Sequence, residues 1–413
     1  MQTRRNFLRF GILAGAVGAS RIFANESGAG GANSSVNSGA NSANSAAIQN
    51  TAAQSAQNLG FDITKPIKCK GYAGFDESGE LRPWEFERRA VGDHDILIDI
   101  KIASICHSDI HQIHGDWGKT PYPQVPGHEI AGVVVAVGAK VSKFRIGERA
   151  GVGCMVGSCG HCHECKDGHE ELCDEAVYTY GYPSNAEPGG ITQGGYSDKL
   201  VVSEDFAIHL PESIPFDRVA PLLCAGITTY SPIIKNQVRP GDKVGVVGIG
   251  GLGHIAVKLL VSKGATVYAF TTTPEKKDAI KALGAHEVIV VRDSKDLAAY
   301  KATLDYMIAT VPEVFDITSY ATCVRPGGTF TLVGLAKGFE ARLQSNVLGR
   351  ARGNFNASYI GGIPQTQEVI DYCARNGIAP EVQIIEARQI PQAWRDVVAK
   401  KARFRYVIDT ATL

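Results

Sequence analysis

The chain has 413 residues, of which 44% are hydrophobic and 20% are charged, and its formal net charge at neutral pH is zero. These values are ordinary for a globular protein of two or three domains. A neutral balance gives no reason to expect nucleic acid or an anionic membrane as a partner, because both are bound through positive charge.

Residues 1–24 have the pattern of an export signal. Arg4 and Arg5 precede a short apolar run that is too short to span a bilayer, which is typical of a signal peptide and predicts no stable membrane anchor after processing. The arginine pair resembles the twin-arginine signal and predicts folded export to the periplasm. Cleavage after Ala24 is a candidate, although Ile22 fits the −3 position poorly. One alternative is a disordered basic tail, and another is a segment that is not recognised, which would leave the protein in the cytoplasm.

Residues 25–60 consist almost wholly of Asn, Ser, Ala, Gly, Gln and Thr. Such a segment has too little apolar surface to offset the entropy of ordering, so we predict a flexible linker. The folded part is expected to begin after it.

Residues 68–225 have the pattern of a mostly β domain. Residues 95–102 carry an apolar residue at every even position, which is typical of a half-buried strand, and residues 132–138 form a second candidate strand bounded by glycines. Turns rich in Gly and Pro divide the rest into short pieces.

Three possible metal ligands lie far apart in this region. They are Cys106 in ICHSD, His128 in VPGHE and Cys224 in LLCAGIT. A catalytic zinc needs about three protein ligands and one open position. Taken singly, each has a plainer interpretation, because free cysteines are often buried in cores and a histidine can simply occupy a turn.

A four-cysteine cluster lies between the second and third of these motifs. Its spacing is Cys-x2-Cys-x2-Cys-x7-Cys, at Cys159, Cys162, Cys165 and Cys173. Four thiolates would saturate a tetrahedral zinc ion and leave no position for substrate. An iron–sulfur cluster is the alternative, but the ferredoxin run has three residues and then Cys-Pro after its third cysteine, and this sequence does not.

Ten cysteines in an exported protein would usually suggest disulfides. A protein exported in the folded state can instead have its thiolates bound to metal before it crosses the membrane. The pattern therefore favours a metalloprotein over a disulfide scaffold.

The second half of the chain alternates strands and helices, which predicts a parallel, doubly wound α/β sheet. The expected strands are 244–248, 265–270, 287–291 and 329–333, and the expected helices are 254–263 and 275–283.

A glycine fingerprint follows the first of these strands. Gly248-Ile-Gly250-Gly251-Leu252-Gly253 matches G-x-G-x-x-G between a strand and a helix, which is the context of a dinucleotide site. The glycines allow a tight turn, close approach of the pyrophosphate and close helix packing. The helix N-terminus offers free N–H groups to the phosphates.

The next strand ends at Thr271, where NAD-binding proteins usually have an acidic residue. Hydroxyls and an ammonium group would suit a ribose 2′-phosphate, so Thr271, Thr272 and Lys276 predict NADP. Glu275 weakens this prediction, and Lys276 with Lys277 could instead be a solvated helix start.

The motifs ICHSD, VPGHE, the four-cysteine cluster, LLCAGIT and GIGGLG occur in the order found in the zinc-dependent medium-chain alcohol dehydrogenases. The sequence most resembles the cinnamyl-alcohol-dehydrogenase-like branch, which includes bacterial NADPH-dependent aldehyde reductases. The resemblance runs from about Lys68 to Asp409.

The resemblance implies an α/β protein with two domains. A GroES-like, mostly β catalytic domain would comprise residues 61–225 and 361–413, including a structural zinc lobe. A Rossmann NADP-binding domain would comprise residues 226–360. It also implies two zinc ions per chain and a homodimer.

The resemblance assigns roles by position. Cys106, His128 and Cys224 match the catalytic zinc ligands, Glu129 an alternate ligand, and Asp109 the acid that orients the histidine. The cysteine cluster matches the structural zinc site, and Cys154 is expected not to be a ligand. The other matched positions are Ser108 and His111 (proton relay), Thr228, Ser358 and Ile360 (nicotinamide surroundings), and Trp117 and Tyr178 (substrate pocket).

The function implied is reversible hydride transfer between NADP(H) and an apolar or aromatic aldehyde or alcohol. Tyr178 replaces a tryptophan common in plant lignin-pathway members, which argues against true cinnamyl-alcohol specificity. The alternative is an exported zinc- or thiol-binding protein that has lost catalysis.

Overall fold

The computed structural model describes residues 60–413. The predicted signal at 1–24 and the predicted linker, apart from its last residue, lie outside the described residues. Within residues 60–413, none of the helices combines the length and the apolar character that a membrane span needs.

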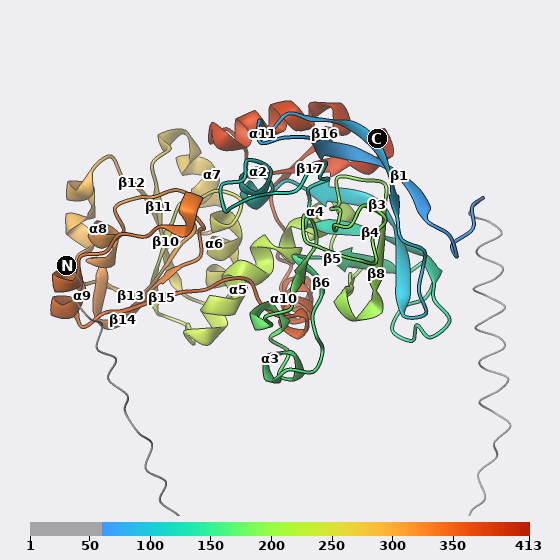
Figure 1. Cartoon of the computed structure of the whole chain (residues 1–413). Coiled ribbons are helices and arrows are strands. Elements are labelled where there is room, and N and C mark those ends of the chain that lie inside the picture. Colours follow the sequence, from blue (N-terminus) through green and yellow to red (C-terminus); the bar gives the residue numbers. More distant parts are fainter. Residues whose placement is uncertain (1–59) are drawn as a thin grey trace, which may run out of the picture. The chain divides into compact units, whose positions relative to one another are not determined.

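The first sheet has seven strands in the order β16-β17-β3-β4-β5-β9, with β8 pairing beside β17 on the same side of β3 (Figure 1). A separate hairpin, β1 with β2, packs its apolar side chains into the same core. The strand bounds are β1 Ile67–Gly74, β2 Leu81–Arg88, β3 Asp95–Ser104, β4 Ile130–Val137, β5 Arg149–Val152, β8 Lys199–Ser203, β9 Ile208–His209, β16 Val382–Glu386 and β17 Arg405–Asp409.

The expectation of a half-buried strand at 95–102 is wrong for most of β3. Leu97, which the alternation places on the polar side, is fully buried, and only Lys101 is exposed. The reason is that β3 is a central strand with a core on each face. Ile96, Ile98 and Ile100 pack into one hydrophobic cluster, and Leu97 packs into another.

The second sheet has six strands in the order β12-β11-β10-β13-β14-β15, all parallel, which is the doubly wound arrangement of dinucleotide-binding domains. The strand bounds are β10 Lys243–Val247, β11 Thr266–Thr271, β12 Glu287–Val290, β13 Leu304–Ala309, β14 Val324–Leu332 and β15 Asn354–Ala357. Hydrophobic clusters cover both faces of this sheet, so its inner strands β10, β11 and β13 are mostly apolar and buried, whereas β15 at the edge is not.

The two sheets share one hydrophobic core. Val244 and Val246 of β10 pack in the same cluster as Ala131 of β4 and Leu223, while the opposite face of β10 contributes Val247 to a separate cluster. The helices are α2 His107–Ile113, α3 His163–Lys166, α4 Phe216–Val219, α5 Ala225–Lys235, α6 Gly253–Ser262, α7 Lys277–Ala282, α8 Ile317–Ala321, α9 Ser345–Ala351, α10 Ile363–Arg375 and α11 Ile390–Val398.

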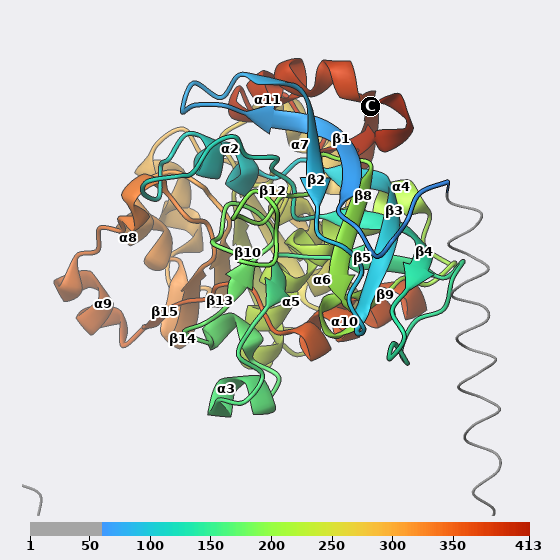
Figure 2. The same cartoon turned by 45° about the vertical axis from the view of Figure 1, so that its right-hand side comes forward.

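The segment around α3 stands out from the rest of residues 60–413 in both views (Figures 1 and 2). Next to it, the short strands β6 Met155–Gly157 and β7 Val177–Tyr178 pair with each other. The predicted cysteine cluster lies between these two strands.

Candidate active site

Four side chains, spread over a span of more than a hundred residues between Cys106 and Cys224, meet in one buried group. The ligand atoms of Cys106, His128, Glu129 and Cys224 all lie within 4.8 Å of one another, and all four residues are buried. Cys106 follows β3 as the N-cap of α2, and Cys224 is the N-cap of α5. Two sulfurs and a nitrogen, with a carboxylate beside them, form a donor set that suits zinc.

The turn before His128 requires glycine. Gly127 has φ +107°, and a Cβ atom there would lie 2.6 Å from the Tyr196 ring. The bend this allows brings His128 into the interior, where its Nδ1 lies 2.8 Å from Asp109 Oδ1. With Nδ1 engaged by Asp109, Nε2 remains for a metal ion.

The electrostatics of the group favour deprotonated sulfur at Cys106. Its shared hydrogen bond with Cys224 holds the pKa of Cys106 well below its ordinary value and raises the pKa of Cys224. Burial opposes the charged form of His128, but the Asp109 carboxylate outweighs it and raises the pKa of His128. Metal binding requires deprotonated ligands, so a metal ion at this group would have to displace the protons that the raised pKa values of His128 and Cys224 favour.

Glu129 forms a buried ion pair that the sequence did not predict. Its Oε1 lies 3.0 Å from the Arg405 guanidinium, which also donates to the carbonyl of Ile105 at 2.7 Å. Burial raises the pKa of Glu129 to about 8, and Arg405 works in the opposite direction. Arg405 lies three hundred residues from Ile105 along the chain, so no local pattern could have shown this pairing.

The proton-relay candidates lie on α2, next to the metal group. Ser108 Oγ is 3.7 Å from Cys106 Sγ, and both Ser108 and His111 line the same pocket. His111 Nδ1 lies 2.8 Å from Asp116 Oδ2, and its buried Nε2 has no hydrogen-bond partner among the described residues. Asp116, which sequence reasoning missed, therefore holds His111 with Nε2 available to a ligand.

The glycine fingerprint has the geometry of a nucleotide cradle. Gly248 has φ +83°, and a Cβ atom on Gly253 would meet the Gly248 carbonyl at 2.0 Å, so side chains are excluded there. A Cβ atom on Gly250 would meet no atom within 4 Å. Gly250, Gly251 and Leu252 line the same cavity as the metal group, which has a volume of about 410 Å³.

The end of β11 presents hydroxyls and one cation to this cavity. Thr271, Thr272 and Lys276 line it, whereas Glu275 is exposed and does not. Lys276 is buried, which contradicts a solvated helix start for this residue, although Lys277 is exposed. Burial lowers the pKa of Lys276 to about 8, so its ammonium is still the main form at neutral pH.

The nicotinamide and substrate candidates divide into those that line the cavity and those that do not. Thr228, Ile360, Trp117 and Tyr178 line it, while Ser358 is half-buried and does not. The wall also contains aromatic residues that were not predicted: Tyr182, whose ring centroid lies 4.7 Å from that of Tyr178, and Tyr359, at 6.1 Å.

Cys154 belongs to this cavity rather than to the cysteine cluster. It lines the pocket, and a side-chain hydrogen bond joins it to Cys224. It is not a member of either group that could hold a metal ion. That it is not a ligand stays a prediction.

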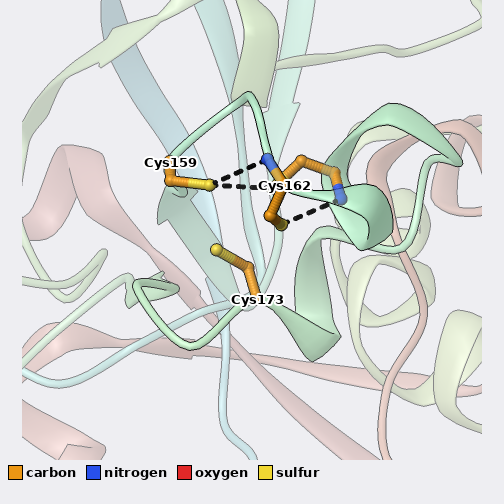
Figure 3. A group of neighbouring side chains, drawn as sticks. Cys159, Cys162 and Cys173 are labelled. Atoms are coloured by element: carbon orange, nitrogen blue, oxygen red, sulfur yellow. Dashed lines mark hydrogen bonds between the residues drawn. The ribbon is translucent and has the colours of Figure 1, made fainter.

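The four cysteines of the cluster converge at the second possible metal site. The sulfurs of Cys159, Cys162, Cys165 and Cys173 lie within 4.8 Å of one another, and Figure 3 shows three of them facing a common centre. Backbone N–H groups donate to the sulfurs, at 3.3 Å for Cys162 to Cys159 and 3.4 Å for Cys165 to Cys162. Hydrogen bonds from the backbone of His161 and Cys162 lower the pKa of Cys159 to about 6.

The histidines of this lobe, His161, His163 and His169, are all exposed. The lobe is fastened to the rest of the protein at the start of α10, where Glu170 Oε2 accepts from the backbone N–H of Ile363 at 2.9 Å.

Comparisons with known proteins agree with this geometry. Residues 92–212 match the alcohol dehydrogenase GroES-like domain, and residues 251–375 match the zinc-binding dehydrogenase domain. The chain is 44% identical to the aldehyde reductase YahK of Escherichia coli, over 84% of this chain and 99% of that one. The chain belongs to the zinc-dependent medium-chain alcohol dehydrogenases, in the cinnamyl-alcohol-dehydrogenase-like branch.

The names of two further relatives include the nucleotide NADP. The chain is 42% identical to the NADP-dependent alcohol dehydrogenase C 1 of Mycolicibacterium smegmatis, over 83% of this chain and 98% of that one. The crystal structure of a cinnamyl alcohol dehydrogenase from Helicobacter pylori complexed with NADP(H) superposes with a TM-score of 0.80 at 40% identity, covering 84% of this chain and 99% of that one. As a member of this family, the protein is an oxidoreductase acting on CH–OH groups, and the non-catalytic alternative has no support.

Proposed function

We propose that the enzyme reduces apolar or aromatic aldehydes with NADPH, and oxidises the corresponding alcohols in reverse. One observation supports this above all. A single cavity contains the sulfur and nitrogen donors of Cys106, His128 and Cys224, the glycine cradle at 248–253 and the hydroxyl-lined end of β11. When bound, zinc would polarise the carbonyl oxygen and the nicotinamide would supply the hydride.

The chain's own side chains supply orientation and proton transfer. Ser108, beside the metal group, is placed to give a proton to the substrate oxygen, and His111, whose Nε2 has no partner among the described residues, would replenish that proton through the ribose hydroxyl of the bound nucleotide. Asp116 keeps the other nitrogen of His111 occupied. The aromatic wall around Tyr178 offers an apolar surface on which a substrate of that kind can be held.

The two groups of metal-binding side chains support two zinc ions per chain, one catalytic and one structural. The site with Glu129 and Arg405 beside it can leave a coordination position for substrate, whereas the four-cysteine site is saturated by thiolates.

The proposal is tested by two measurements on the purified protein. Elemental analysis should give two zinc ions per chain, and a panel of aldehydes should be reduced at the expense of NADPH, with aromatic and apolar aldehydes turned over best. Zinc and NADPH binding without turnover of any aldehyde or alcohol would contradict it.

We expect NADPH to be preferred over NADH. A carboxylate at the end of β11 would repel the 2′-phosphate, and Thr271 has none, while Lys276 offers a positive charge from within the cavity. Thr271→Asp should therefore invert the preference, measured as the ratio of kcat/KM for the two cofactors. Equal efficiency with both cofactors in the unmodified enzyme would contradict the assignment.

The same lysine predicts a pH effect on this preference. Its charge is present below its pKa of about 8 and is lost as pH rises through that value, so NADPH affinity should decline above pH 8. NADH has no 2′-phosphate and should not lose affinity through this group. Lys276→Arg, which stays charged, should keep the preference constant across this range.

We further propose that the chain is exported to the periplasm in a folded state. The support is the Arg4–Arg5 pair, the short apolar run and the polar segment that follows. Cell fractionation should find activity in the periplasm, and an Arg4→Lys, Arg5→Lys double variant should leave it in the cytoplasm. Cytoplasmic activity in both proteins would show that the segment is not recognised.

We also propose a homodimer. β15 pairs only with β14, so one edge of the six-stranded sheet carries backbone groups that no other described strand covers. Such an edge is a ready site for pairing with a second copy. Light scattering on the purified protein should give twice the chain mass; the mass of one chain would exclude the dimer.

A further inference from the structure

Asp109 does more than hold the metal-binding histidine. Its side chain is completely buried, and both of its oxygens are occupied. Its Oδ1 accepts hydrogen bonds from Nδ1 of His128 at 2.8 Å and from the backbone N–H of Gly127 at 3.2 Å. Its Oδ2 accepts a hydrogen bond from the backbone N–H of Cys106 at 2.8 Å. One carboxylate thus holds the backbone of Cys106 and the backbone of the residue before His128, and Cys106 and His128 are both predicted zinc ligands.

A buried tyrosine from a distant part of the chain donates one more hydrogen bond to Asp109. The hydroxyl of Tyr196 donates to Asp109 Oδ2 at 3.0 Å, and the Trp394 indole lies 3.4 Å from the same hydroxyl. Burial, and to a smaller extent the negative charge of Asp109, raises the pKa of Tyr196 well above its ordinary value. The phenol therefore stays protonated and can donate a hydrogen bond.

Tyr196 is itself fixed in place. The guanidinium of Arg88, which is buried, donates to the carbonyls of Gln193, Gly194 and Lys199 at 2.6–2.8 Å, so it clamps the backbone on both sides of Tyr196. The Tyr196 backbone N–H bonds the Pro126 carbonyl at 2.9 Å, two residues before His128. The phenol therefore has little freedom to leave Asp109.

A second buried phenol, Tyr180, lies close to the same histidine and carboxylate. The Tyr180 hydroxyl lies 3.2 Å from His128 Nδ1, but that nitrogen directs its proton at Asp109 and has no lone pair to offer. The phenol proton therefore goes to Asp109, with which Tyr180 also shares a hydrogen bond.

We propose that Tyr196, assisted by Tyr180, is a positioning residue for the catalytic metal. By donating to Asp109 they hold the carboxylate in place, and Asp109 in turn fixes the ring plane and the tautomer of His128. The strength of zinc binding and the geometry at the metal then depend on a hydroxyl that touches neither metal nor substrate. This inference rests on the proposed zinc site.

The test uses the full-length protein loaded with zinc and the variants Tyr196→Phe and Tyr180→Phe, which remove only a hydroxyl. The matched control is Tyr230→Phe, another buried phenol that donates to a carboxylate, Glu368, at 2.7 Å, outside the Asp109 network. Two readouts do not depend on turnover: the rate at which a chelator removes the catalytic zinc, and the visible absorption of the cobalt-substituted enzyme.

Tyr196→Phe should release the catalytic zinc about 10-fold faster or more and shift the cobalt bands, and Tyr180→Phe should do the same to a smaller extent. The control should match the unmodified enzyme in both readouts. Unchanged zinc release and an unchanged cobalt spectrum in both variants would overturn the inference, even if their thermal stability fell. If the unmodified protein holds no zinc at this site, the proposed function fails, and the inference fails with it.

Discussion

Replacing Cys106 by alanine is expected to remove one zinc ion per chain and nearly all turnover while leaving the fold in place. Cys106 is one of three sulfur and nitrogen donors in the buried group, and a two-donor remnant binds zinc poorly. Because the Lewis acid contributes several kcal/mol to the barrier, the loss in kcat should be on the order of a thousandfold or more.

Zinc content, kcat and circular dichroism measure the three parts of this expectation. Cys323→Ala is a suitable control, since Cys323 is also a fully buried thiol but packs in the hydrophobic cluster of the nucleotide-binding sheet. It should lose some stability and no zinc. A Cys106→Ala enzyme that retains both zinc ions and its activity would refute the ligand assignment.

Replacing Cys162 by serine should have the opposite profile, with stability lost before catalysis. Of residues 158–173, only Cys173 is buried, so the lobe has almost no apolar core of its own. Its order must then come from the metal, because structural zinc contributes directly to folding. We expect a destabilisation on the order of 4 kcal/mol and rapid proteolysis within the lobe.

Thermal unfolding and limited proteolysis measure this effect, and the exposed His163→Ala variant in the same lobe should behave like the unmodified protein. At low temperature the Cys162→Ser enzyme should keep much more activity than Cys106→Ala. Iron with acid-labile sulfide in the purified protein would refute a zinc assignment for this cluster.

The parts of the site that could be predicted from spacing alone are motifs whose residues lie close together in the sequence. The glycine fingerprint lies between a strand and a helix, and the cysteine cluster is compact, so spacing alone pointed to both. Cys106, His128 and Cys224 are far apart, and the family motifs around them were needed to group them. The structure then brought these three side chains into one buried group.

The residues that were missed act across long sequence separations. Arg405 meets Glu129, and Tyr196 meets Asp109, through packing of segments that no short pattern connects. Asp116 is close to His111 in sequence, but it lies beyond the end of α2, where helical spacing no longer predicts contacts.

The misjudged burial of β3 has the same origin. An alternating pattern predicts burial on one face of a strand only, but β3 has a hydrophobic cluster on each face, so Leu97 is as buried as its even-numbered neighbours.

Whether Glu275 would oppose NADP binding could also not be decided from the sequence. Only the structure shows that Lys276 is buried in the cavity while Glu275 is exposed.

The position of β17 bears on when this site can form during folding. β17 pairs with β3 through Val407, and its Arg405 contacts both Glu129 and the carbonyl of Ile105, three hundred residues earlier in the chain. Contacts between residues so far apart in sequence form only after a large loss of chain entropy, so they tend to form late in folding. We therefore expect the cysteine, histidine and glutamate side chains to reach their final arrangement late, once β17 has joined the sheet.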